Sequence, residues 1–529
     1  MKQDWRSLSL KEQIAQMIIV RASGHLFDHQ IRYPAWEANN QQLKTWLREL
    51  NLGGVILLGG SSVELQVRSQ QLQSWANIPL FIAADIEEGI GQRFSGGTWF
   101  PPPMALGKIY EQNPDLARQY AYQMGEVTAE EALAVGINWL LAPVVDVNNN
   151  PDNPAINIRA FGDRPEVVAD LTTAFIQGAK STAILTTAKH FPGHGDTSTD
   201  SHLDLPALNH SESRLATVEL PPFEQAIATG VDSVMTAHLL IAAWDAKLPV
   251  TLSQKIVTEI LRNRLGFSGL VVTDALIMGG ITKYATPEIV AVMAVEAGTD
   301  ILLMPDNPEV AIASIYDAVQ TGRIKQSRIQ ESLARIWQAK QQVFADSTTI
   351  TELSSDRARS TVNSILKNSL QQSKTSIITD PHAPGRNLIV VDDLLTANYL
   401  DINSPAITIP QEYNYQRQLV DGNTLDCILL DSRPTLLQVF IRGNPFRGNA
   451  GLTNKTKAIY QQLITNQQVA GIAIYGSPYV LEWFKSIMGL DLPWVFTYGQ
   501  MPQAQAIALK TLFTDNSQPL EFQSHNFGF

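Results

Sequence analysis

A short segment of the chain, residues 189–202, concentrates side chains that can give and take protons. It reads Lys-His-Phe-Pro-Gly-His-Gly-Asp-Thr-Ser-Thr-Asp-Ser-His and contains three of the nine histidines of the chain. Its glycines and its proline favour a sharply turning loop over a helix or a strand. Loops held on a rigid scaffold often carry binding and catalytic residues, so we predict a functional loop here rather than a merely solvated one.

Asp200 and His202 form a candidate acid/base pair within this segment. They stand two residues apart, so in an extended backbone both side chains point to the same side. A carboxylate placed in this way can orient an imidazole and stabilise its protonated form. With an unperturbed pKa near ~6.5, histidine can protonate a leaving oxygen and later deprotonate a water molecule. The alternative is a structural Asp–His hydrogen bond that tethers the loop.

Asp274 is a candidate nucleophile. It directly follows the run Val271-Val272-Thr273, which is typical of a β-strand. A carboxylate at the end of a strand can attack an anomeric carbon and form a covalent glycosyl intermediate. The alternative is an aspartate that caps the next helix.

Two cations complete the set of candidate residues. Arg159 and Lys189 supply hydrogen-bond donors that suit sugar hydroxyls or a substrate carboxylate. Lys189 could equally be a buried counter-ion that neutralises Asp85 or Asp274, and both roles can hold together.

A scaffold must position these residues, and the first two-thirds of the chain reads as alternating strands and helices. Several apolar runs lack polar alternation, as expected for parallel strands covered on both faces. Amphipathic segments lie between them, for example 114–135, 166–180 and 286–297. The eight predicted strands are Gln16–Val20, Gly54–Leu58, Leu80–Asp85, Asn138–Asp146, Ile184–Lys189, Ser233–Ala237, Leu270–Asp274 and Asp300–Met304.

Eight such units predict an α/β fold, a (β/α)8 barrel that occupies residues 1–345. Polar side chains end five of the strands, which supports the count, because barrel enzymes build their active sites at the carboxyl ends of different strands. These side chains are Asp85, Asp146, Lys189 with His190, His238 and Asp274.

A smaller domain follows the predicted barrel. We expect a linker over 346–378, with a helix at 357–371, and then an α/β domain with a parallel sheet over 379–529. This domain shows no phosphate-binding loop and no dinucleotide fingerprint, so we expect a structural role, packing against the barrel. Its predicted strands are Asn387–Val391, Cys427–Leu430, Leu437–Ile441, Gly471–Tyr475 and Trp494–Tyr498, and its helices include Lys455–Thr465 and Gln503–Leu512.

Composition narrows the classes of partner. The 529 residues carry a net charge of −12, and no long Lys/Arg cluster is present, which argues against nucleic acid and anionic membranes. The one cysteine, Cys427, rules out an intramolecular disulfide framework and fits a reducing compartment. No apolar run has the length of a signal peptide or a membrane span, so we expect a soluble cytoplasmic protein.

Residues 189–202 closely resemble the signature of glycoside hydrolase family 3, in its β-N-acetylglucosaminidase branch. Other pieces of the family pattern occur in the same order, and the resemblance covers roughly residues 5–345. The rest of the chain resembles, more loosely, the second α/β domain of two-domain members. The other pieces are Leu8-Ser9-Leu10 with Gln16-Met17, Asp85 with Glu87, Arg159 with Phe161-Gly162, Met235-Thr236-Ala237-His238 and Thr273-Asp274-Ala275-Leu276.

The resemblance implies a role for each matching residue. Asp274 matches the nucleophile and His202 the general acid/base, with Asp200 as its partner, on a mobile loop after the fifth strand. Four residues match those that bind the N-acetylglucosamine (GlcNAc) in the −1 subsite, and two further strand-end residues are expected to line the same site. These six are Asp85, Arg159, Lys189 and His190, then Asp146 and His238.

The chain departs from the family pattern at two places. Where the family commonly has Glu-Gly-Gly-Arg, this chain has Glu87-Glu88-Gly89-Ile90, which adds a charge and removes a cation near Asp85. Asn157 stands where glycine is usual.

We therefore expect a retaining, exo-acting β-N-acetylglucosaminidase that needs no cofactor and no metal. The resemblance implies a small carbohydrate or muropeptide substrate, derived from peptidoglycan; the oligomeric state is left open. A phosphorylase with the same site is an alternative, because a histidine acid/base does not repel phosphate, and a β-glucosidase of the family fits less well. More distant alternatives are a non-catalytic sugar-binding protein and a barrel metallohydrolase with the ligands His190, His194, His202 and Asp196.

Overall fold

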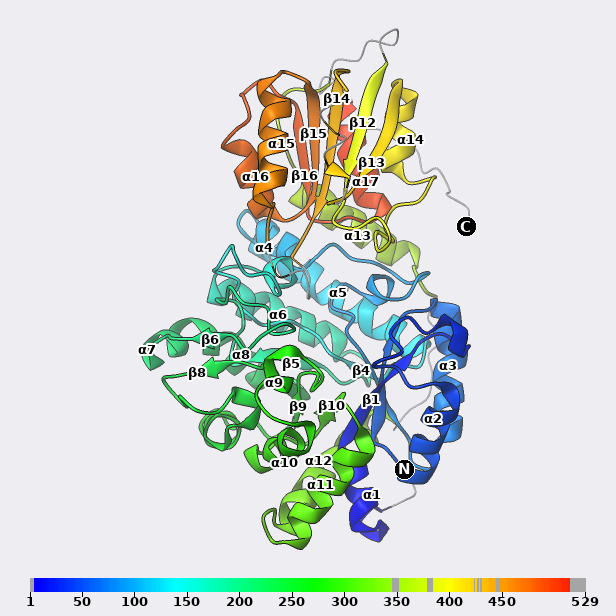
Figure 1. The fold of residues 1–529 in the computed structure, drawn as a ribbon, viewed down its shortest axis with the longest axis vertical. Helices are drawn as coiled ribbons and strands as arrows, with labels where there is room; N and C mark the ends of the chain where they lie inside the picture. Colours follow the sequence, from blue (N-terminus) through cyan, green and yellow to red (C-terminus); the bar gives the residue numbers. More distant parts are fainter. Residues whose placement is uncertain are drawn as a thin grey trace. The chain divides into compact units, whose positions relative to one another are not determined.

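A computed structural model of the chain describes residues 4–344, 352–377, 384–422, 424–425, 428, 431–443, 448 and 450–513. Contacts divide the chain into two compact units (Figure 1). Unit 1 is Met1–Ile365 with Gly443–Ala450, and unit 2 is Leu366–Arg442 with Gly451–Phe529. The boundaries expected at 345 and 379 fall in or beside residues outside the described ranges, so they stay predictions.

Unit 1 is built on eight parallel strands that close into a ring. One sheet has the order β10-β1-β2-β3-β4 and a second has the order β5-β7-β9. Isolated bridges join Trp139 to Leu185, Val144 to Lys189 and Val272 to Ile301, which connects the two sheets at both edges. The strands are β1 (Ile18–Ser23), β2 (Gly54–Leu58), β3 (Phe81–Ala84), β4 (Trp139–Leu140), β5 (Thr187–Phe191), β7 (Ser233–Thr236), β9 (Leu270–Thr273) and β10 (Leu302–Leu303).

Helices surround this barrel (Figure 1), and each of the eight predicted strand regions overlaps one of its strands. The predicted barrel fold is therefore confirmed. A π-helical segment, Lys255–Arg264, lies between β7 and β9. The α-helices are α1 (Leu10–Ala15), α2 (Asn40–Thr45), α3 (Ser62–Trp75), α4 (Met104–Tyr110), α5 (Pro114–Ala134), α6 (Pro165–Ala179), α7 (Glu212–Arg214), α8 (Leu220–Ala228), α9 (Gly279–Thr282), α10 (Pro287–Ala297), α11 (Pro308–Gln320) and α12 (Gln326–Val343).

A pair of short strands that the sequence did not indicate lies outside the ring. β6 (Ala207–Leu208) and β8 (Leu240–Ile241) pair in parallel. They join the segment after β5 to the segment after β7. This pairing anchors the chain just beyond the carboxyl end of the histidine-rich loop.

A buried charge cluster lies where the segment that leads into β10 pairs with β9. Asp300 is fully buried and accepts hydrogen bonds from the backbone of Val271 at 3.0 Å and from Ser332 at 2.7 Å. Burial alone would raise the pKa of Asp300, but Arg262, Arg328 and Arg335 overcome that effect and hold it below its usual value. The carboxylate thus ties the strand before the candidate nucleophile to α12.

Unit 2 contains a six-stranded sheet in the order β11-β16-β15-β14-β12-β13. All pairs are parallel except the one between β11 and β16. Helices cover both faces, with α15 and α16 on one face and α14 and α17 on the other (Figure 1). The elements are α13 (Asp356–Ser369), which crosses the unit boundary, β11 (Gln371–Gln372), β12 (Gly385–Val390), α14 (Pro405–Glu412), β13 (Tyr415–Val420), β14 (Thr435–Ile441), α15 (Asn454–Thr465), β15 (Val469–Gly476), α16 (Pro478–Lys485), β16 (Trp494–Thr497) and α17 (Pro502–Phe513).

Two strands of this sheet were not predicted from the sequence. β13 has a half-exposed sequence, Tyr-Gln-Arg-Gln-Leu-Val, at one edge of the sheet, and β11 is two glutamines long. Neither has the apolar run that marks a central strand. The predicted strand Cys427–Leu430 lies outside the described residues apart from Ile428.

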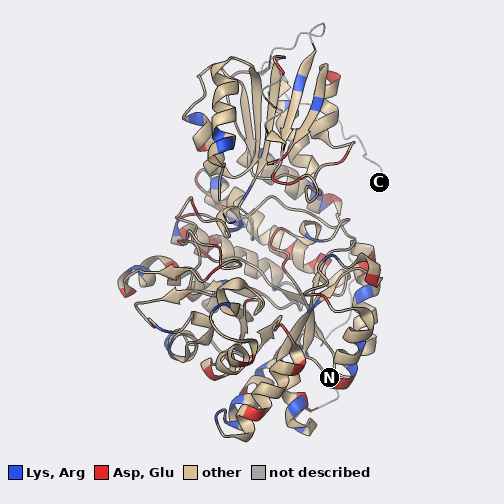
Figure 2. Cartoon of the chain, in the orientation of Figure 1, with Lys and Arg blue, Asp and Glu red and all other residues tan. Residues whose placement is uncertain are grey.

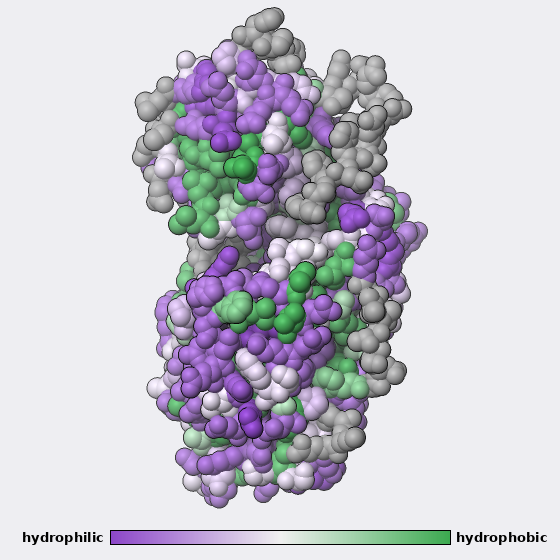
Figure 3. Space-filling view, turned by 90° about the vertical axis from the view of Figure 1, so that its right-hand side faces the viewer, coloured by the Kyte–Doolittle hydropathy of each residue, from purple (hydrophilic) through white to green (hydrophobic). Residues whose placement is uncertain are grey.

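The surface carries both signs of charge, with Lys and Arg interspersed among Asp and Glu on the helices (Figure 2). Hydrophilic residues cover most of the face in Figure 3, and hydrophobic residues gather there in separate groups. Among the helices within the described ranges, none combines the length and the apolar character needed to cross a membrane.

Candidate active site

The candidate nucleophile lies at the mouth of the barrel, one residue after β9. Its Oδ1 accepts a hydrogen bond from the backbone of Ala275 at 2.8 Å. Burial alone would raise the pKa of Asp274, but His190, His238 and His202 together lower it below its usual value. Three predicted site residues, two from the histidine-rich segment 189–202 and one from the segment after β7, therefore lower the pKa of this carboxylate.

His202 and Asp200 form the predicted pair. Asp200 Oδ1 lies 2.9 Å from His202 Nδ1 and also accepts the backbone N–H of His202 at 2.9 Å. The Asp200 side chain is 1% exposed, whereas that of His202 is 20% exposed. With Nδ1 turned to the carboxylate, Nε2 is the nitrogen that can exchange a proton with a substrate.

The loop that carries His202 rests on the segment that follows Asp274. The N–H groups of Gly279 and Gly280 donate to the carbonyl oxygens of His202 and Ser201, each at 3.0 Å. A Cβ at Gly279 would lie 2.8 Å from the His202 oxygen, so only glycine permits this approach. The candidate nucleophile and the candidate acid/base therefore lie on segments that two backbone hydrogen bonds join.

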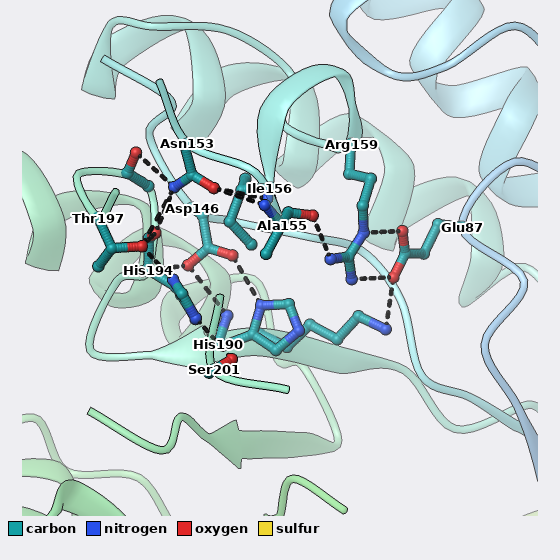
Figure 4. A network of polar contacts seen from close by, with 12 residues as sticks. Glu87, Asp146, Asn153, Ala155, Ile156, Arg159, His190, His194, Thr197 and Ser201 are labelled. Carbon is teal, nitrogen blue, oxygen red and sulfur yellow. Dashed lines mark hydrogen bonds and ion pairs between the residues drawn. The ribbon is translucent and has the colours of Figure 1, made fainter. Parts of the chain in front are cut away.

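Glu87, which follows β3, forms an ion pair with Arg159 (Figure 4), and Lys189 in the middle of β5 joins the same network. Lys189 Nζ lies 2.7 Å from Asp85 Oδ1 and 2.7 Å from Glu87 Oε1. Arg159 binds Glu87 through two hydrogen bonds of 2.8 Å. Lys189 is 1% and Glu87 3% exposed, but Asp85 is 37% exposed. Lys189 is therefore a counter-ion of Asp85 and Glu87, and Asp85 is the member of this network most open to a ligand.

The charges of this network support one another. Burial alone would raise the pKa of Glu87, but Arg159 and Lys189 hold it well below its usual value. Burial alone would lower the pKa of Lys189, but Asp85 and Glu87 raise it above its usual value. Glu87 and Lys189 therefore stay charged at neutral pH.

A second network fixes the beginning of the loop (Figure 4). Asp146 has no exposed surface and lies 2.7 Å from His190 Nδ1. It also accepts the backbone N–H groups of His190 at 3.1 Å and His194 at 2.7 Å. Burial alone would raise the pKa of Asp146, but His190 and His194 lower it. Asp146 therefore positions the ring of His190 as an ionised acceptor.

His194 and His238 are buried and form hydrogen bonds with other groups of the protein. The ring nitrogens of His194 lie 2.8 Å from the hydroxyls of Thr197 and Ser201, and burial lowers the pKa of His194 to about 4. His238 Nε2 donates to the Ala275 carbonyl at 3.1 Å, and burial lowers its pKa as well. Both imidazoles are neutral at neutral pH.

The four residues of the metal-site alternative have different partners. Asp196 lies 3.0 Å from His210 Nε2, while His194 binds two hydroxyls. Within the described ranges, no group of three or more His, Cys, Asp or Glu residues is placed to hold a metal ion.

Asn157 stands where the backbone adopts a left-handed conformation. Its φ is +46°, in the left-handed region where glycine is at ease and asparagine is tolerated better than most residues. The replacement of the usual glycine by asparagine therefore keeps the turn that leads into Arg159.

Comparison with known proteins agrees with this geometry. Residues 9–339 match the family model described as "Glycosyl hydrolase family 3 N terminal domain". Residues 379–514 match the model of the "Bacterial Glycosyl hydrolase family 3 C-terminal domain". The chain belongs to glycoside hydrolase family 3.

Individual family 3 relatives match parts or all of the chain. A β-hexosaminidase A of Pseudoalteromonas piscicida is 34% identical over 56% of this chain, and the match spans 55% of that relative. A β-hexosaminidase of Nitrosomonas eutropha is 34% identical over 53% of this chain and 83% of its own length. The solved family 3 β-N-acetylglucosaminidase of Paenibacillus sp. str. FPU-7 is 28% identical, with a TM-score of 0.81, and covers 96% of this chain and 97% of that one.

Glu87 lies in a sequence motif but was not predicted as a site residue, and His194 was predicted only as a metal ligand. Arg93 was missed entirely; its Nε donates to the carbonyl of Asp85 at 3.1 Å. The signal for Glu87 was its position two residues after Asp85, on the same side of an extended chain. The signal for Arg93 was weaker, because it depends on how the turn after β3 folds back.

Replacing Glu87 by Gln should lower the free energy of unfolding by about 3–5 kcal/mol at pH 7, because Lys189 and Arg159 would lose their shared buried partner. Chemical denaturation measures this loss. The pKa of Glu87 in the folded protein lies below its ordinary value of 4.5, so its contribution is present above about pH 4.5 and is lost as the pH falls through the folded-state pKa. The variant should therefore lose less stability than the wild type on acidification.

Glu482→Gln is the matched control, because Glu482 is 66% exposed and pairs with Lys485 on the surface of α16. Equal losses of stability in the two variants would contradict a buried, charge-paired Glu87.

Proposed function

We propose that this family 3 protein is a retaining, exo-acting β-N-acetylglucosaminidase. The observation that carries the proposal is the pairing of an ionised Asp274 with a histidine–aspartate acid/base on a loop that rests on the segment after Asp274. The names of the relatives support the choice of substrate, since they are β-hexosaminidases and a β-N-acetylglucosaminidase.

The proposed reaction has two steps. Asp274 attacks C1 of a terminal β-linked GlcNAc while His202 protonates the departing glycosidic oxygen. The resulting ester between Asp274 and the sugar is then hydrolysed by water, and His202 takes the proton from that water. Asp200 stabilises the imidazolium in the first step, which is the role a triad aspartate plays.

The remaining site residues divide into two proposed roles. Asp85, Lys189, Arg159 and His190 bind the sugar, with Asp85 as the hydroxyl acceptor because it is the most exposed of its network. Asp146 and His238 are positioning residues, since both are fully buried against protein partners. As the natural source of terminal GlcNAc we propose peptidoglycan fragments, which the family resemblance implies.

Replacing Asp274 by Ala should reduce turnover of p-nitrophenyl β-GlcNAc by about 10⁴-fold or more, because no nucleophile remains. The rate is read from p-nitrophenol release. Glu288→Ala, an exposed change at the beginning of α10, is the control and should leave the rate unchanged. Near wild-type hydrolysis by Asp274→Ala would refute the assignment.

Replacing His202 by Ala should slow both steps, by about 10²–10⁴-fold. With a highly activated aryl substrate the first step no longer needs an acid, so azide should restore part of the second step and give the β-glycosyl azide. Chromatography of the sugar products measures this rescue. If azide had no effect while the rate fell, His202 would not be the base of the second step.

Phosphorolysis is the second candidate, and the neutral or cationic character of the His202 imidazole is the observation that favours it. A carboxylate acid/base would repel phosphate, but this imidazole does not. Turnover in phosphate buffer should give free GlcNAc as the main product; GlcNAc-1-phosphate as the main product would replace hydrolysis by phosphorolysis. An aryl β-glucoside in the same assay tests the β-glucosidase alternative.

A further inference from the structure

Asn153, a fully buried residue in the segment between β4 and α6, has no part in the roles proposed above. Its side-chain amide contacts two different segments (Figure 4). The Oδ1 atom accepts the backbone N–H groups of Ala155 at 3.0 Å and of Ile156 at 2.8 Å. The Nδ2 atom donates to the carbonyl oxygens of His194 at 2.8 Å and of Gly195 at 2.9 Å. One buried side chain therefore joins the segment that follows it to the histidine-rich loop.

The segment on the acceptor side of Asn153 leads to Arg159. Arg159 Nη1 donates to the carbonyl oxygen of Ala155 at 2.8 Å, while its other two guanidinium nitrogens bind Glu87. The N–H group of Ala155 is thus held by Asn153, and its carbonyl oxygen by Arg159. The guanidinium group that we assign to sugar binding is therefore two hydrogen bonds away from Asn153.

On the donor side of Asn153, a chain of hydrogen bonds runs through the loop and ends beside His202 (Figure 4). Thr197 Oγ1 lies 3.4 Å from Asn153 Nδ2 and 2.8 Å from His194 Nδ1. The other ring nitrogen, His194 Nε2, lies 2.8 Å from the hydroxyl of Ser201, the residue before His202. All the side chains of this chain are buried, so its hydrogen bonds do not compete with water.

The loop and the segment after β4 also meet backbone to backbone. A Cβ atom at Gly195 would lie 1.8 Å from the carbonyl oxygen of Val147, so only glycine permits this approach. Beside it, Asp146 accepts the N–H group of His194 at 2.7 Å. The two segments are therefore packed too closely to move independently of each other.

The amide of asparagine suits this place because both of its ends are used. The oxygen faces two N–H groups, and the nitrogen faces two carbonyl oxygens. Aspartate has the same shape and would keep the oxygen on the side of Ala155 and Ile156. On the side of the loop, however, it would turn a second oxygen toward carbonyl oxygens and would have no donor for them. An aspartate at position 153 thus breaks one connection and preserves the other.

We propose that Asn153 is a positioning residue that couples the sugar-binding Arg159 to the acid/base His202. The inference rests on the proposed β-N-acetylglucosaminidase function and deepens it. A sugar bound at Arg159 then favours the loop conformation that brings His202 to the glycosidic oxygen, and that conformation in turn favours the bound sugar. Loss of the donors of Asn153 displaces His202 without removing it.

Asn153→Asp tests whether this residue acts through the acid. The kcat/KM for GlcNAc-β-1,4-GlcNAc, whose departing oxygen needs a proton, should fall about 100-fold, the cost of a misplaced acid. The kcat/KM for 2,4-dinitrophenyl β-GlcNAc should change by less than about twofold, because its leaving group departs without a proton. An equal fall for both substrates would overturn the inference, since a merely structural role lowers both.

Asn138→Asp is the matched control. Asn138 is buried directly before β4, at the amino end of the strand and away from the barrel mouth. Its amide likewise accepts an N–H group, that of Ile82 at 2.8 Å, and donates to a carbonyl oxygen, that of Leu80 at 3.1 Å. Any fall in kcat/KM for this variant should be the same for the two substrates.

Thr197→Val is a second variant, which removes one link of the chain without burying a charge. It should lower the kcat/KM for the disaccharide about tenfold and leave that for the dinitrophenyl substrate unchanged. Thr172→Val is its control, because the Thr172 hydroxyl is also buried but binds the Val168 carbonyl within α6 at 2.6 Å. A loss confined to the disaccharide in neither Asn153→Asp nor Thr197→Val would overturn the coupling.

Hydrogen exchange separates this inference from the function on which it rests. Without substrate, peptides that cover residues 194–203 should exchange about tenfold faster in Asn153→Asp than in the wild type, and no faster in Asn138→Asp. Faster exchange, together with absence of turnover of both GlcNAc substrates by the wild type, would refute the function and keep the positioning of the loop by Asn153. Unchanged exchange in Asn153→Asp would overturn the positioning role, whatever the turnover.

Discussion

Carboxylates that a closed barrel removes from water must be kept ionised by partners from other strands, and the candidate site depends on this constraint. Glu87 is held by Lys189 of β5 and by Arg159. The pKa of Asp274, after β9, is lowered by three histidines. Because a buried carboxylate is costly without cations or donors, segments from elsewhere in the ring must supply them at this end of the barrel.

The loop after β5 shows how a segment without regular structure is given one conformation. Its backbone N–H groups are bound by Asp146 at one end, and its carbonyl groups by Gly279 and Gly280 at the other. Neutral His194 fills its centre with hydrogen bonds to Thr197 and Ser201. The loop thus brings the proposed acid/base to the proposed nucleophile without a helix or strand beneath it, while His202 keeps some exposure to solvent.

The two sides of the barrel mouth carry different kinds of residue. Strands β3, β5 and β9 supply the charged groups that we assign to sugar binding and bond cleavage. The segments after β1 and β10 border a cavity whose described lining includes Arg21, Trp36 and Met304.

The sequence by itself determined the eight barrel strands, the five polar strand ends and the pairing of Asp200 with His202. These depend on local patterns, namely apolar runs, strand-end residues and a spacing of two. Tertiary structure alone decided that Lys189 neutralises Asp85 and Glu87, that His194 is a neutral support and that Trp36 faces a cavity bounded by residues after β10. The half-exposed strand β13 and the pair β6–β8 belong to the same group. Apart from Thr197 and Ser201, which bind His194, their partners lie in distant parts of the chain. A one-dimensional pattern does not record which distant segments meet when the ring closes.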